Sequence, residues 1–355
     1  MNYGVFVLLL LAAAPDVATR ALIDSGHCKQ ARALLEPRVK RDPADAEAAA
    51  LLARVRIEFQ DFDAAVPLAE TATKLDGGNA DYHAILAEAV GRAAEHASVF
   101  KQLGMARRFR QEEELAISLN PKNIDAREGL IEYYLNAPAI AGGDRKKADQ
   151  VAEDIARLDT AAGFLARATI LTETKAAGDV EALYAQARAA ADAPLMKYRA
   201  TLLLMNAYLA HGTRKLDAAE QLARSLIALD PERAAGYGGL VVAYGTAGRT
   251  ADLEATLAEA ERAVPDDLSP FYQAGRTLLI RNGDLARAET YFRKYLTAEP
   301  EAGEATWAHA HWRLGLVLEK LGRRAEARSE IEQATRLKPD LEEAKQDLRR
   351  LRDRS

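Results

Sequence analysis

The chain has 355 residues, 49% of them apolar and only 6% aromatic, and its 48 basic and 53 acidic residues give a net charge of -5. This balance argues against a nucleic-acid-binding protein, because such proteins usually carry a basic excess on one face. The single cysteine, Cys28, excludes an internal disulfide and a cysteine-rich metal site.

Residues 1–18 are predicted to form a signal peptide. Residues 5–14 are an unbroken apolar run, which is too short for a transmembrane helix of about 20 residues but suits the core of a secretory signal. Cleavage after Ala14 would leave Pro15 as the first residue, and cleavage after Ala18 is the alternative. We expect an exported protein, periplasmic or secreted, without a membrane span in its mature chain. Because no Lys or Arg precedes the apolar run, an apolar first helix in a cytoplasmic protein is the other interpretation.

Residues 19–339 contain helix-stopping residues at intervals of 34 to 44 residues. Most of them are proline, which cannot continue a helix because it lacks the N–H and clashes with the preceding turn. The stops are Pro43, Gly77, Pro121, Thr160, Pro194, Pro231, Pro265, Pro300 and Pro339.

A small residue lies about twelve positions before most stops. We expect two helices to cross closely at this point, so that bulky side chains are excluded. These positions include Ala65, Ala148, Ala182, Ala219, Ala288 and Ala327. The residues between them have the three-and-four apolar spacing of amphipathic helices.

The clearest unit is residues 314–339, which read as a helix, a turn at Gly322, a second helix and a stop. It resembles the tetratricopeptide repeat, a helix–turn–helix unit with a period of about 34 residues. Gly275 and Gly315 also occupy positions of the family pattern. The resemblance implies an all-α fold, a right-handed superhelical solenoid of about nine antiparallel helix pairs. Residues 340–355 would form a polar capping helix.

Several units depart from the family pattern. The first is degenerate, with a short first helix. The third, between Gly77 and Pro121, is ten residues longer than the period, which adds about three helical turns in total, so we expect both of its helices to be lengthened. The segments 97–107 and 133–143 are similar to a bacterial subgroup of repeat proteins with signal peptides and no established activity.

The sequence offers no catalytic set. Ser98 and Lys101 fit a penicillin-interacting nucleophile motif but lack its companion elements. His309 and His311 would point to opposite sides of a helix and cannot share a metal ion. Carboxylate runs such as residues 112–114 are predicted to be solvated surface. We therefore predict a protein that is not an enzyme and has no cofactor or metal.

In this family the first helix of each pair lines the concave wall, where ligands usually lie. The predicted lining is mainly acidic in the N-terminal half: Glu47, Arg54, Glu58, Asp81, Glu88, Arg92, Asp125, Glu128 and Glu132. In the C-terminal half it is aromatic and mixed: Phe164, Arg167, Lys175, Tyr198, Met205, Tyr208, Tyr272, Arg276, His309 and Trp312.

We hypothesise a scaffold whose C-terminal half binds a peptide segment or a partner helix of another protein, since Tyr, Trp and Arg dominate binding energy at interfaces. The proposed contacts are Arg167, Tyr198, Tyr208, Tyr272, Arg276 and Trp312, with both arginines holding carboxylates. The alternative for each aromatic is packing between helices. The alternatives for the whole protein are an envelope protein that binds polysaccharide or peptidoglycan, and a cytoplasmic regulator. The oligomeric state stays open.

Overall fold

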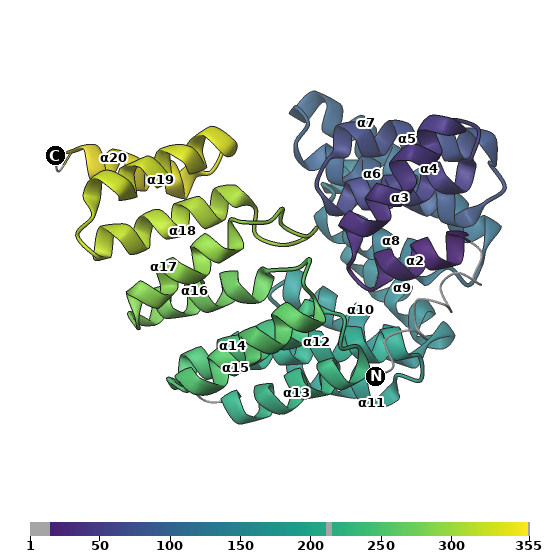
Figure 1. Ribbon diagram of the computed structural model, residues 1–355. Helices are drawn as coiled ribbons and strands as arrows, with labels where there is room; N and C mark the ends of the chain where they lie inside the picture. Colours follow the sequence, from purple (N-terminus) through teal and green to yellow (C-terminus); the bar gives the residue numbers. More distant parts are fainter. Residues whose placement is uncertain (1–14, 211–214, 354–355) are drawn as a thin grey trace. The chain divides into compact units, whose positions relative to one another are not determined.

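The computed structural model describes residues 15–210 and 215–353, and within these ranges every regular element is a helix (Figure 1). The apolar run at residues 5–14 lies outside the described residues. The chain divides into two compact units, Met1–Ala200 and Thr201–Ser355, with the boundary inside one helix. Each unit is described by itself below.

Unit 1 begins with ten helices and one short 3-10 turn. They are α2 (Pro15–Asp24), α3 (Cys28–Arg41), α4 (Ala46–Glu58), α5 (Phe62–Leu75), α6 (Ala80–Glu95), α7 (Val99–Leu119), α8 (Ile124–Asn136), η1 (Ala139–Ala141), α9 (Arg145–Leu158), α10 (Thr160–Glu173) and α11 (Val180–Ala190). The unit boundary falls within α12 (Pro194–Ala210).

Unit 2 continues with the remaining helices. They are α13 (Leu216–Leu229), α14 (Ala234–Ala247), α15 (Thr250–Ala263), α16 (Ser269–Arg281), α17 (Leu285–Tyr295), α18 (Trp307–Lys320), α19 (Arg324–Leu337) and α20 (Glu342–Asp353).

The helices from α2 to α19 follow one another as nine successive pairs, which confirms the predicted architecture. Partners such as α4 and α5, α6 and α7, and α18 and α19 pack on each other. The first helices of neighbouring pairs also touch, α4 on α6, α6 on α8 and α8 on α10 in unit 1, and α14 on α16 and α16 on α18 in unit 2. Each unit therefore has a continuous layer of first helices (Figure 1).

Side-chain caps fix where several first helices begin. Asp45, Asn79 and Asn123 each follow a stop by two residues, and each side chain accepts a backbone N–H of the next helix. Such a cap satisfies one of the donors that a helix start leaves without a partner. The stop and the cap together set the register of α4, α6 and α8.

Close helix crossings occur at the predicted small residues. Ala65, Ala148, Ala219, Ala288 and Ala327 are fully buried. Gly275 and Gly315 are buried as well, and a Cβ added at Gly315 would lie 2.5 Å from Cγ1 of Ile331 on the partner helix.

Ala182 is the exception, because it is only half-buried. It follows its N-cap, Asp179, by three residues, whereas Ala65 and Ala327 follow theirs by four. A one-residue offset turns a position by about 100° around the helix. The expected close crossing at Ala182 was therefore wrong, and Ala187 is the fully buried alanine of α11.

Two further features concern element length and the end of the array. α6 has 16 residues and α7 has 21, compared with 13 in both α4 and α8. At the other end, α20 covers α19 with Ala344, Leu348 and Leu351, which are buried together with Leu341 just before the helix. The predicted C-terminal capping helix is thus present.

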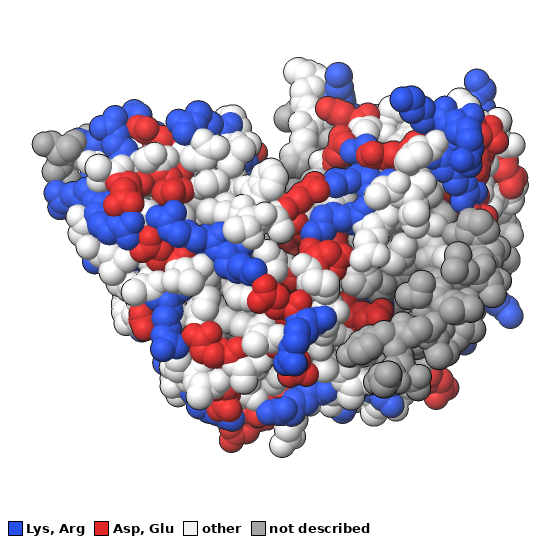
Figure 2. Space-filling view, viewed as in Figure 1, with Lys and Arg blue, Asp and Glu red and all other residues white. Residues whose placement is uncertain are grey.

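Ion pairs join second helices that are one repeat apart. Arg108 Nη1 lies 2.6 Å from Glu70 Oε1, joining α5 and α7. In unit 2, Arg287 pairs with Glu254 at 2.8 Å, and Arg323 pairs with Glu289 at 2.6 Å. Acidic and basic side chains accordingly lie beside one another over the face seen in Figure 2. On these helices, a carboxylate with a cationic partner is common.

The crossing at Ala327 gives a stability prediction. Ala327→Leu adds bulk at a fully buried position and should lower the unfolding free energy by about 1–3 kcal/mol, the usual cost of overpacking. Chemical denaturation measures the change. The control is Ala325→Leu, two residues earlier on the exposed side of α19, and equal stability of the two variants would contradict the crossing.

Candidate functional site

Unit 1 places acidic side chains at equivalent positions of neighbouring first helices. Glu88 follows its cap, Asn79, by nine residues, and Glu132 follows Asn123 by the same number. Because α6 packs on α8, equal register brings these two carboxylates close to each other. Burial raises the pKa of Glu88 most, and the like charges of Glu58 and Glu132 raise it further.

Four carboxylates form a series across consecutive first helices, and we call them the acidic strip. They are Glu58 on α4, Glu88 on α6, Glu132 on α8 and Glu173 on α10. Each interacts electrostatically with the next, Glu58 with Glu88, Glu88 with Glu132, and Glu132 with Glu173. Glu58, Glu132 and Glu173 are exposed and Glu88 is half-buried. The strip therefore faces solvent.

Among the described residues, no cation lies within ion-pair distance of the acidic strip, whereas two nearby carboxylates are paired. Glu47 accepts hydrogen bonds from Arg20 Nε at 2.8 Å and from the Tyr82 hydroxyl at 2.9 Å. Glu128 accepts two hydrogen bonds from Arg199, at 3.0 and 2.9 Å. Asp125, near the start of α8, likewise has no ion pair among the described residues, so the unpaired carboxylates of this wall include the strip and Asp125.

The arginines near the acidic strip are matched to other carboxylates. Arg54 pairs with Asp24 at 3.1 Å, and Arg92 pairs with Glu95 at 3.5 Å. Both arginines lower the pKa of Glu88, but burial and the neighbouring carboxylates outweigh them and raise it overall. The wall therefore keeps an excess of negative charge.

A buried carboxyl group lies behind the strip. Glu113 comes from the second helix α7, is only 3% exposed, and its Oε2 has no hydrogen-bond partner. Its carboxyl group lies against α8 where that helix has no side chain, because a Cβ added at Gly129 would be 2.1 Å from Glu113 Oε1. Glu113 thus reaches from the second-helix layer to the backbone between Glu128 and Glu132.

The placement of Glu113 corrects the sequence prediction for residues 112–114. Only Glu114 is exposed. Glu112 is half-buried, and its Oε2 lies 2.6 Å from His83 Nδ1. Successive residues of a helix point in different directions, so a run of three carboxylates cannot all face solvent on a packed helix. In the sequence, the signal for this burial is Gly129 on the facing helix α8, because glycine has no side chain and leaves room for the Glu113 carboxyl group.

Burial is the first cause of the altered acidity in this cluster. Loss of hydration raises the pKa of Glu113 well above its usual value, and Glu88, Asp125 and Glu132 add to the effect. Although the Glu132 side chain is exposed, partial loss of hydration beside its neighbours also raises its pKa, and Arg92 opposes the shift whereas Glu128 and Glu173 reinforce it. Glu88, Glu113 and Glu132 therefore take up protons at higher pH than ordinary carboxyl groups do.

The structure distributes the six predicted partner contacts over the two units. Arg167 and Tyr198 belong to unit 1, and Tyr208, Tyr272, Arg276 and Trp312 belong to unit 2. Arg167 and Arg276 are exposed on first helices, and no ion pair to either is found within the described part of the chain. Their role as carboxylate-binding residues stays a prediction.

The aromatic members of that set are less accessible than expected. Tyr198 and Tyr272 are only 5% and 7% exposed, and the Tyr272 ring packs against Phe292 and Tyr295. Trp312 is half-buried and donates a 2.9 Å hydrogen bond from Nε1 to Asp347 on the capping helix. Packing between helices, the alternative kept open above, describes these three rings. Tyr208 is half-buried, with Lys215 Nζ 4.5 Å from its ring centre.

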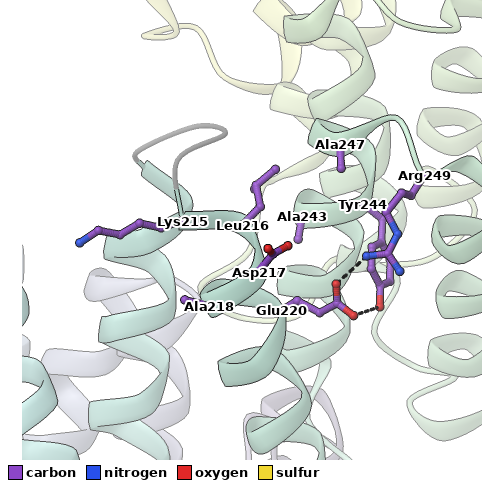
Figure 3. A pocket seen from close by; sticks show the side chains of 9 residues that line it. All are labelled: Lys215, Leu216, Asp217, Ala218, Glu220, Ala243, Tyr244, Ala247 and Arg249. Atoms are coloured by element: carbon purple, nitrogen blue, oxygen red, sulfur yellow. Dashed lines mark hydrogen bonds and ion pairs between the residues drawn. The ribbon is translucent and has the colours of Figure 1, made fainter.

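A hollow of about 370 Å³ lies beside α13 and α14 in unit 2 (Figure 3). Its lining residues are Lys215, Leu216, Asp217, Ala218, Glu220, Ala243, Tyr244, Ala247 and Arg249. Glu220 already accepts hydrogen bonds from Arg224, Tyr244 and Arg249. These bonds occupy the carboxylate that a ligand would need, so the hollow is a weaker candidate than the acidic strip.

Other kinds of site were sought in the same ranges. The described residues contain no group of three or more His, Cys, Asp or Glu side chains arranged to hold a metal ion. Nor does any helix of residues 15–210 or 215–353 combine the length and apolar character needed to cross a membrane.

Comparisons with known proteins agree with the architecture. Family models described as tetratricopeptide repeat match residues 20–89 and 277–342. Yeast Tom70 is 13% identical with a TM-score of 0.50, and the likeness covers 95% of this chain and 80% of Tom70. A tetratricopeptide repeat protein from Parabacteroides merdae is 13% identical with a TM-score of 0.43, covering 86% of this chain and 98% of that one. No curated protein gives a significant match.

The succession of helix pairs and the two matched segments define the class: an all-helical repeat protein of the kind that serves as a scaffold for protein–protein interaction. The chain contains tetratricopeptide repeats, which the family models match in residues 20–89 and 277–342. Proteins of this class are generally non-enzymatic. The likeness to Tom70 shows the fold alone.

The burial of Glu113 predicts a pH-dependent stability. Its folded pKa lies above the ordinary value of 4.5, so the folded state binds more protons and stability falls as pH rises through the window above 4.5. Glu113→Gln removes this cost and should be more stable by roughly 1–3 kcal/mol at neutral pH, with the difference shrinking as pH falls. Urea denaturation across pH measures it.

The control for this prediction is Glu114→Gln, which changes the exposed neighbour and should alter stability by no more than about 0.5 kcal/mol. A Glu113→Gln variant with the pH dependence of the wild-type protein would contradict the assignment.

Proposed function

We propose that this protein is a non-enzymatic scaffold that binds an extended segment of a partner protein along the first-helix wall of unit 1. The observation that supports the proposal is the acidic strip, a row of carboxylates without ion-pair partners on four consecutive first helices. A charged side chain left unpaired on a wall where other carboxylates are paired is available to a partner. The strip spans consecutive repeats, which suits an extended ligand.

This proposal moves the binding surface from the C-terminal half, where the sequence analysis located it. Tyr198 and Tyr272 are buried in the helix packing, so their rings cannot make the direct contacts first expected. Arg167 is exposed on α10, six residues before Glu173 and therefore about 120° from it around the helix. It lies beside the strip, where a partner segment would meet one cation.

The proposal includes export, with residues 1–18 removed as a signal peptide. The apolar run at residues 5–14 supports it. The fold described from Pro15 onward includes an ion pair between Asp16 and Arg38. Cleavage after Ala14 keeps this pair, and cleavage after Ala18 removes it.

Two alternatives remain from the sequence analysis. Sugar binding relied on exposed aromatic rings, and the burial of Tyr198 and Tyr272 takes away two of them, although Trp307 is 41% exposed. A cytoplasmic regulator would have the same fold and would differ in retaining its N-terminus. Sugar binding gives no role to the acidic strip, whereas a cytoplasmic regulator could use the strip in the same way.

Site-specific cross-linking tests the proposed surface. A benzophenone amino acid replaces Arg92 or Arg167 on first helices of unit 1, or Asp149, which is exposed on the second helix α9. The protein is irradiated in its own cells, and we expect cross-links to one partner protein from the first two positions and none from Asp149. Cross-links only from Asp149, or equally from all three positions, would place the interface elsewhere.

Mass spectrometry of the protein purified from its own cells tests export. We expect a mature N-terminus at Pro15 or Thr19, because the small residues that precede them suit signal cleavage. Retention of residues 5–14 would contradict export and favour the cytoplasmic regulator.

A further inference from the structure

The acidic strip also indicates the chemistry of the partner. Its carboxylates repel one another, and partial loss of hydration adds to the cost of keeping the half-buried Glu88 and the exposed Glu132 charged. A ligand that supplies positive charge between them would relieve both effects. A neutral or acidic ligand would relieve neither, because it brings no compensating charge.

Glu113 is a second and independent feature of the same place. It is a nearly fully buried carboxyl group whose Oε2 has no hydrogen-bond partner. It projects from α7 against α8, where its Oε1 lies at Gly129, and the charges of both Glu88 and Glu132 act on its carboxyl group. A buried polar atom without a partner is rare in folded proteins and calls for a specific explanation. A donor seated between Glu88 and Glu132 would approach the Glu113 carboxyl group.

We propose that the acidic strip binds a basic segment of the partner, with a Lys or Arg side chain seated between Glu88 and Glu132 in front of Glu113. This inference rests on the proposed function and names the chemistry of its ligand. The guanidinium or ammonium group donates hydrogen bonds to the two carboxylates of the strip. Further basic residues of the segment meet Glu58 and Glu173 on the flanking first helices.

The charged groups around this seat determine how binding depends on pH. Arg54 on α4 and Arg92 on α6 oppose the negative charge, whereas Glu58, Asp125 and Glu128 add to it. Seating a cation favours the ionised form of each carboxyl, so binding releases protons. Affinity for a basic segment therefore rises from mildly acidic to mildly alkaline pH, while Lys and Arg stay charged throughout.

The test uses the full-length protein and three fluorescently labelled peptides of equal length, in which Ala alternates with Lys, with Glu or with Ser. Fluorescence polarisation at low ionic strength measures binding, since salt screens such contacts. We expect the Lys peptide to bind at least about tenfold more tightly than the other two, because charge-assisted hydrogen bonds are the strong ones. Equal affinity for all three peptides would overturn the proposal.

Two double variants separate the strip from the net charge of the protein. Glu88→Gln/Glu132→Gln should lose the preference for the Lys peptide and its pH dependence. The matched control, Asp63→Asn/Asp149→Asn, removes the same charge from exposed positions of second helices and should keep both. Equal loss in the two variants, or a flat pH profile in the wild-type protein, would overturn the proposal, because either result indicates attraction without a defined seat.

The cross-linking experiment distinguishes failure of the basic segment from failure of the proposed function. Cross-links from positions 92 and 167 together with no preference for the Lys peptide would leave the proposed function standing and overturn the basic segment alone. Absence of cross-links from both positions would overturn the proposed function itself.

Discussion

Each repeat depends on the close crossing of its two helices at residues without bulk. Ala65, Ala148 and Ala327 are fully buried at such crossings, and Gly315 leaves no room for a Cβ beside Ile331. Because the crossing fixes how each second helix sits on its first helix, it also determines which side chains reach the first-helix layer. Glu113 reaches that layer only because Gly129 opposes it.

Because the unit repeats, side chains at the same position of neighbouring first helices lie close together. Caps at Asn79 and Asn123 give α6 and α8 the same register, so that Glu88 and Glu132 meet as neighbours. Elsewhere similar proximity is used to pair opposite charges, as in Arg323 with Glu289 or Arg199 with Glu128. Exposed ion pairs contribute little to stability, but their absence along the strip leaves carboxylates free to bind a partner.

The sequence predicted the repeat architecture well because its signals are local and recur nine times. Prolines and small residues at fixed spacing indicated the helix pairs and the capping helix. Side-chain exposure was harder to predict, because it depends on how second helices rotate against first helices. Tyr272 and Tyr198 were placed on a groove and are buried, while Glu113 was placed in solvent and is buried. Nor could composition and spacing predict that Ala182 lies one residue closer to its N-cap than the equivalent alanines do.

The central claim is that unit 1 holds clustered carboxyl groups whose charge a basic ligand compensates. The most direct measurement is an NMR titration of the protein with carboxyl-13C-labelled glutamate, with resonances assigned through Glu88→Gln, Glu113→Gln and Glu132→Gln. The account predicts that these three groups titrate above ordinary glutamates, as Glu304 of unit 2 also should, and that the Lys peptide lowers the pKa values of Glu88, Glu113 and Glu132 but not that of Glu304. Ordinary titration of all three, or titration unchanged by the peptide, would contradict it.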